Sequence, residues 1–93
     1  MKVRFTRIAQ RDLARIHAYI SQDSPVAASR VVARLVELSR QLADNPFQGR
    51  ATDEPNARVI VAPRLRYFIF YVISADEFTL PTSAIHRVVV RQA

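Results

Sequence analysis

The stretch Arg66-Tyr67-Phe68-Ile69-Phe70-Tyr71-Val72-Ile73 decides the fold of this chain. Successive side chains of an extended segment alternate between two faces, and both faces are apolar here. One face carries Tyr67, Ile69, Tyr71 and Ile73, and the other carries Phe68, Phe70 and Val72. Aromatic and β-branched residues favour strands, so the stretch predicts a central strand that begins at Arg66 and is covered on both sides or nearly so. The two tyrosines are expected in the core, with their hydroxyls at its margin.

Shorter strands are predicted on either side of this stretch. Upstream, residues 2–6 alternate charged or polar with apolar side chains, and residues 58–61, Arg58 followed by three β-branched residues, form a short strand that Pro63 closes. Downstream, residues 78–80 begin an extended piece, Pro81 interrupts it, and residues 84–90 resume it with a β-branched end. The interruption predicts a bulge, an edge position or a loop excursion near Pro81.

Two amphipathic helices are predicted between the first two strands. Thr6 can cap a helix over residues 7–21, and Ser24 followed by Pro25 can begin a second over residues 25–44, which Asn45 and Pro46 end. Their apolar stripes are Ala9, Leu13, Ile16, His17 and Ile20 in the first, and Ala28, Val31, Val32, Leu35, Leu38 and Leu42 in the second. Asp12 is expected at the surface, in a weak pair with Arg15. The short link makes the helices antiparallel neighbours.

This order of elements predicts an α+β fold of two layers, β-α-α-β-β-β, with a helical hairpin packed on a mostly antiparallel sheet. Residues 1–93 are expected to form one domain. Residues 46–56 read as a loop, in which Gly49 is expected to allow a turn.

The composition narrows the possible functions. The chain has no cysteine and two histidines, so a metal site or another bound cofactor is not expected. The first residues alternate in polarity and no stretch is long and apolar enough for a membrane span, which predicts a cytoplasmic protein without a membrane partner. The formal net charge of +6, with thirteen of fourteen basic residues being arginine, favours acidic partners such as an acidic protein, nucleic acid or the ribosome.

Several residues, taken in order, carry a resemblance to a known family. They are Asp12-Leu13, Ile16, Tyr19-Ile20, Ser24-Pro25, Ala27-Ala28, Pro46, Gly49-Arg50 and the strand that starts at Arg66. In this order the chain resembles the ParE/RelE toxins of type II toxin–antitoxin systems, and most closely the ParE or plasmid-stabilisation branch. The resemblance implies a cognate ParD-like antitoxin bound in a hetero-oligomer. It also implies DNA gyrase as the target in the ParE branch and messenger RNA on the ribosome in the RelE branch.

The chemistry of the two branches differs. Metal-free RNA cleavage requires a base, an acid and cations beside the strained phosphate. Phe68 stands where ribonucleolytic members often carry a basic residue, and the strand at Val59-Ile60-Val61 lacks lysine. These features favour a non-enzymatic gyrase inhibitor over a RelE-like, ribosome-dependent endoribonuclease. In that alternative His86, Arg87 and Arg66 are the catalytic candidates, although the register of the last strand stays open.

Two further sets of residues are candidates for binding. Contacts to the target or to a partner are expected from Arg50, Arg58, Arg66, Tyr67 and Arg91. Arg50 has an alternative, a hydrogen bond to loop carbonyls or an ion pair with Asp53 or Glu54. The resemblance implies that the antitoxin folds onto this protein, and Ala9, Leu13, Leu35 and Leu42 are candidates for its groove, with the core as the alternative for each.

Overall fold

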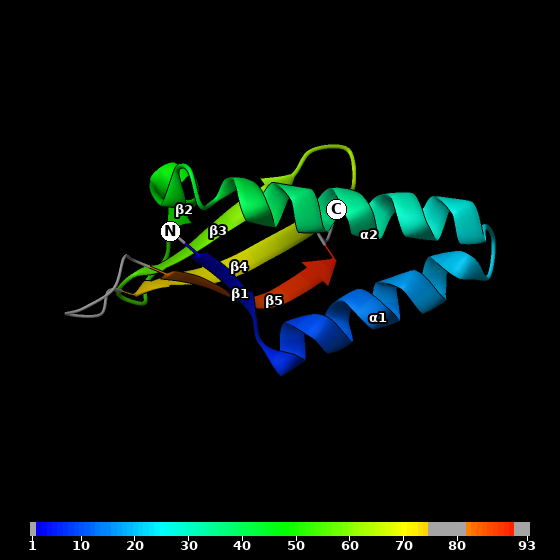
Figure 1. The fold of residues 1–93 in the computed structure, drawn as a ribbon, viewed down its shortest axis with the longest axis horizontal. Helices are drawn as coiled ribbons and strands as arrows, with labels where there is room; N and C mark the ends of the chain where they lie inside the picture. Colours follow the sequence, from blue (N-terminus) through cyan, green and yellow to red (C-terminus); the bar gives the residue numbers. More distant parts are fainter. Residues whose placement is uncertain (1, 75–81, 91–93) are drawn as a thin grey trace.

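The fold is described from a computed structural model, which covers residues 2–74 and 82–90. Strand β1 (Lys2–Phe5) leads into helices α1 (Arg7–Ser21) and α2 (Pro25–Gln41), as Figure 1 shows. A short 3-10 helix, η1 (Pro46–Gln48), follows, and the chain continues with strands β2 (Arg50–Ala51), β3 (Ala57–Ala62), β4 (Tyr67–Ser74) and β5 (Thr82–Val90). The predicted α+β architecture is therefore confirmed, with a short strand β2 added to the predicted order.

Both helices begin at the predicted residues. The hydroxyl of Thr6 accepts a hydrogen bond from the amide of Ala9, and the hydroxyl of Ser24 accepts one from the amide of Ala27, at 3.1 Å each. Helix α1 has the predicted bounds, whereas α2 ends three residues before the predicted Asp44. The amides of residues 42–44, which follow the last residue of α2, bond to carbonyls three residues back. The chain therefore leaves the helix in tighter turns of the 3-10 type.

The sheet has the strand order β1-β5-β4-β3-β2, which places β4 in the centre as predicted. The β3–β4 and β4–β5 pairs are antiparallel, while β1 runs parallel to β5 along one edge. Phe70 pairs with Arg87 and Tyr71 pairs with Ile85, so His86 is the extra residue of a β-bulge. The expected irregularity near Pro81 falls outside the described residues, because Pro81 is not among them.

The core lies between the helices and one face of the sheet. Ala9 and Ile16 of α1, Leu35, Leu38 and Leu42 around α2, and Tyr67, Ile69, Tyr71 and Ile85 of the sheet form one buried cluster. The opposite face, called the outer face below, carries Phe68, Phe70 and Val72 of β4 beside Val61, Val59 and Ala57 of β3. Phe70 is 36% exposed there, and the other five side chains are half-buried. The inner face of β4 is therefore covered as predicted, whereas its outer face is half-buried and leaves Phe70 exposed.

Three further expectations need correction. Arg66 lies in the turn before β4 with a φ of 62°, so it does not begin the strand. Asp12 is buried at 6% exposure instead of lying at the surface beside Arg15. His17 is exposed instead of joining the buried stripe, and its ring nitrogens lie 3.3 and 3.4 Å from the hydroxyls of Ser21 and Ser29. Helical spacing gives the direction of a side chain, but the neighbouring helix decides how far the apolar face extends.

Candidate interaction surface

A buried tyrosine fixes the segment that follows α2. The hydroxyl of Tyr71 donates a hydrogen bond of 2.6 Å to the carbonyl of Pro46 and accepts one of 2.9 Å from the amide of Gly49. Tyr71 itself is 1% exposed, whereas η1 contains no buried residue. A side chain of the central strand therefore holds a surface segment at both of its ends.

Position 49 has no room for a side chain, which is why it is glycine. Its φ of −74° and ψ of 158° are an extended conformation that any residue can adopt, so the expectation that Gly49 allows a turn is wrong. A Cβ atom at residue 49 would lie 2.5 Å from Oη and 2.8 Å from Cε1 of Tyr71. The absence of a side chain lets the tyrosine approach the backbone closely enough to bond to it.

Arg58 binds the same segment from β3, where it pairs with Tyr71. Its Nη1 donates hydrogen bonds of 2.7 Å to the carbonyl of Gly49 and 3.2 Å to the carbonyl of Phe47. The guanidinium also lies over the Phe47 ring, with 5.1 Å between Cζ and the ring centroid. Arg58 was predicted to contact a target, and the structure shows that it already contacts this segment of its own chain.

Burial raises the pKa of the Tyr71 hydroxyl above its usual value. The hydrogen bond from the amide of Gly49 and the charge of Arg58 act in the opposite direction but do not outweigh burial. The pKa of Tyr67 is also raised, chiefly by burial and secondarily by Tyr19. Tyr71 therefore keeps its proton, and with it the hydrogen bond to Pro46, throughout the neutral pH range.

The other predicted contact residues do not form one cluster with Arg58. Arg50 is exposed on the edge strand β2, and no hydrogen bond or ion pair to another described residue holds its guanidinium. Arg66 is exposed in the turn after β3, at the end of that strand far from Arg58. Tyr67 is 8% exposed and belongs to the core. Arg91 lies outside the described residues.

The candidates for an antitoxin groove are mostly core residues. Ala9, Leu35 and Leu42 have no exposed surface, and Leu13 is half-buried against the same cluster. In this chain they fill the space between the helices and the sheet, so a groove lined by them is not open. The large apolar residues that the helices expose are instead Ile8, Tyr19 and Val26.

The catalytic candidates of the ribonuclease alternative are only partly described. His86 and Arg87 belong to β5, which the structure gives as one continuous strand over Thr82–Val90. The last predicted strand, residues 84–90, therefore lies within β5, and its register against β4 is defined. Their side chains are outside what the structure describes, and Arg66 lies in a turn at the end of the sheet.

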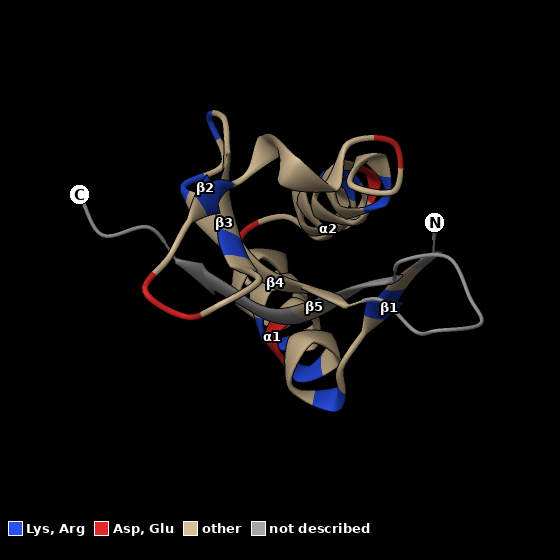
Figure 2. Cartoon of the chain, turned by 90° about the vertical axis from the view of Figure 1, so that its left-hand side faces the viewer, with Lys and Arg blue, Asp and Glu red and all other residues tan. Residues whose placement is uncertain are grey.

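Sequence reasoning missed Phe47. An aromatic residue between Pro46 and Gly49 was a signal, because such a loop is too short to fold a large side chain back into the core. Within the described residues, no group of three His, Cys, Asp or Glu side chains could hold a metal ion. No helix in the described ranges is both long and apolar enough to cross a membrane. Figure 2 shows the basic residues spread over several elements.

Comparisons with known proteins agree in placing this chain among bacterial toxins. A family model described as the ParE toxin of the type II toxin–antitoxin system parDE matches residues 3–87. The chain is 38% identical to toxin Y4kP of Sinorhizobium fredii over 86 residues, which are 92% of this chain and 90% of that protein. It is 36% identical to toxin RelE2 of Caulobacter vibrioides over 70 residues, or 73% of this chain and 80% of that protein.

The fold also has a counterpart among solved structures. A chain from the chromosomal ParDE toxin–antitoxin system of P. aeruginosa superposes with a TM-score of 0.81, and the match covers 99% of this chain and 97% of that one. The two are 23% identical in sequence, so this likeness concerns the fold.

Proposed function

Because this chain belongs to the ParE family of type II toxins, we propose that it inhibits DNA gyrase by binding it, without catalysing a reaction, and that a cognate ParD-like antitoxin neutralises it in a hetero-oligomer. Its site of action would be the cytoplasm, where gyrase acts on DNA.

The observation that carries this proposal is the chemistry of the outer face. On β3 and β4 this face presents Val59, Val61, Phe68 and Phe70, which cannot exchange protons or stabilise a phosphate. The hydroxyl of Tyr71, on the opposite face of β4, is buried and bonded to Pro46 and Gly49. Apolar side chains on a half-buried sheet face are instead suited to contact with another protein.

The charge of the chain supports an acidic antitoxin. A formal net charge of +6 on 93 residues attracts a partner of opposite charge and speeds their encounter. A small protein whose candidate groove residues are buried offers its partner surfaces instead of a deep pocket. A segment that becomes ordered as it binds is suited to such surfaces.

A ribosome-dependent endoribonuclease remains the second candidate function, because one relative carries the name RelE2. The two functions are separated by induced expression in bacteria, with DNA supercoiling and transcript integrity followed in the same cells. Loss of supercoiling or DNA breakage with intact transcripts is the expected result. Rapid messenger cleavage would contradict gyrase inhibition, and loss of that cleavage in His86→Ala would then assign His86 a catalytic role.

A further inference from the structure

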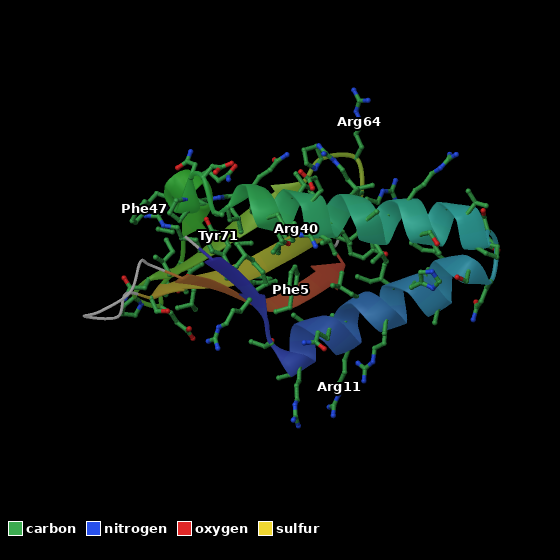
Figure 3. All side chains as sticks on the ribbon, viewed as in Figure 1. Phe5, Arg11, Arg40, Phe47, Arg64 and Tyr71 are labelled. Carbon is green, nitrogen blue, oxygen red and sulfur yellow. The ribbon has the colours of Figure 1, made fainter. Side chains whose placement is uncertain are left out.

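Phe47 is an exposed aromatic residue that is held in one place. The residue is 64% exposed and lies at the end of the molecule opposite the α1–α2 connection (Figure 3). Tyr19 and Val26 are similarly exposed, at 71% and 62%, but they project from helices without a comparable support. Among contacts between described residues, Phe47 alone of these three packs against a cation, because the guanidinium of Arg58 lies over its ring and also bonds to its carbonyl.

The hydrogen bonds that hold this segment do not bury Phe47. Tyr71 and Arg58 make hydrogen bonds of 2.6, 2.9, 2.7 and 3.2 Å with residues 46–49, and this arrangement buries Gly49 but leaves Phe47 exposed. A side chain that is fixed before a partner arrives loses little conformational entropy when it binds. Aromatic residues next to arginine are also the residue types that dominate the energy of protein interfaces.

The charges around Phe47 favour a protein partner over a nucleic acid. Between residues 46 and 58 the positive charges of Arg50 and Arg58 are balanced by Asp53 and Glu54. Arg58 is also occupied by two carbonyls, which leaves Arg50 as the cation at this edge without a bond to a described residue. A polyanion would gain little from this balance of charge.

We propose that Phe47, held by Tyr71, Gly49 and Arg58, is an anchor that enters an apolar pocket on the protein that this toxin targets, with Arg50 meeting a carboxylate beside that pocket. This inference rests on the proposed function, because it takes the target to be a protein. It adds a second contact surface, at residues 46–50, to the outer face on which the proposed function rests.

The test compares Phe47→Ala and Phe47→Gln with the matched control Tyr19→Ala, an exposed aromatic residue near the other end of the molecule. Each chain is expressed from one inducible promoter in a host whose growth the wild-type chain arrests, and each purified chain is titrated against purified bacterial gyrase in a supercoiling assay. Circular dichroism and thermal unfolding verify that the variants are folded. Loss of an interface anchor is expected to raise the concentration needed for half-inhibition about 30-fold for both Phe47 variants, and less than threefold for Tyr19→Ala.

The outcomes separate this inference from the proposed function. Folded Phe47 variants that arrest growth as strongly as the wild type overturn the anchor. A wild-type chain that arrests growth without inhibiting gyrase overturns the proposed target, while the growth of the variants still decides whether Phe47 is the anchor. If arrest proceeds by messenger cleavage and the Phe47 variants abolish that cleavage, the surface contacts RNA and the proposed protein partner is wrong.

Discussion

At the scale of single residues, the contact between Gly49 and Tyr71 determines the shape of the chain after α2. Replacing Gly49 with alanine would place a Cβ atom 2.5 Å from Oη of Tyr71, which forces the ring or the backbone to move. We expect Gly49→Ala to lower the free energy of unfolding by about 1–3 kcal/mol, measured by urea denaturation.

The matching double variant tests the cause of this loss. Tyr71→Phe alone should cost about 1–3 kcal/mol, because it leaves the buried amide of Gly49 without its acceptor. In the Tyr71→Phe background the closest atom is gone, so Gly49→Ala should cost less than it does in the wild type. Strict additivity of the two losses would show that residue 49 and the tyrosine hydroxyl do not interact.

The protonation of Tyr71 gives a prediction on pH. Burial raises its pKa in the folded protein above that of the unfolded chain, so the folded state holds its proton more tightly. The resulting stabilisation is complete below the pKa of an unfolded tyrosine, about 10, and is lost as the pH rises through the folded value. Thermal unfolding should therefore show a stability that declines above about pH 10, and a smaller decline in Tyr71→Phe. Equal slopes for the two proteins would exclude Tyr71 as a source.

At the scale of elements, the caps determine where the helices begin. Thr6→Ala and Ser24→Ala each remove a side-chain acceptor from a first-turn amide, at Ala9 and Ala27 respectively. Each should lower stability by about 1 kcal/mol, or roughly 4–8 °C in the midpoint of thermal unfolding for a domain of this size. Ser29→Ala, the same kind of change inside α2, removes only an exposed 3.4 Å contact with His17 and should stay within about 0.5 kcal/mol. A comparable loss in Ser29→Ala would mean that capping is not the cause.

The elements also show which features a sequence can predict. Local rules give both helix starts and the central strand, since caps and alternation of polarity act over a few residues. They do not give the end of α2, the turn at Arg66 or the burial of Asp12, because each depends on what packs against it. Tyr71 reaches residues that precede it by 22 and 25 positions. No short-range pattern links residues so far apart, which is why the segment held by Tyr71 was not predicted.

At the scale of the whole molecule, the resemblance to the ParE toxins rests on the order of certain residues along the chain. The ParE family match confirms it. The candidate site was less predictable than the fold. Arg50 and Arg58 were named from the sequence, but their unequal roles follow from the carbonyls that Arg58 binds. Phe47 was not named, because its fixed position depends on Arg58 of β3 and Tyr71 of β4, which are distant from it in the sequence. A binding surface that combines side chains of several elements can be recognised only when the arrangement of those elements in the fold is known.

The net charge yields the last prediction, which concerns the encounter with an antitoxin and assumes the proposed acidic partner. The excess of six positive charges is spread over several elements. Association should therefore be accelerated by long-range attraction to the whole surface, and not by one ion pair. Raising the ionic strength from about 0.05 to about 0.5 M shortens the screening length several-fold and should slow association with the antitoxin at least tenfold, as measured by stopped-flow fluorescence. The rate of dissociation should change far less, because short-range contacts govern it. Arg7→Ala, which removes one exposed charge, should lower the association rate less than twofold, and replacing Arg7, Arg11 and Arg15 together should lower it further. An association rate that is independent of salt would show that the charge of this toxin does not guide its partner.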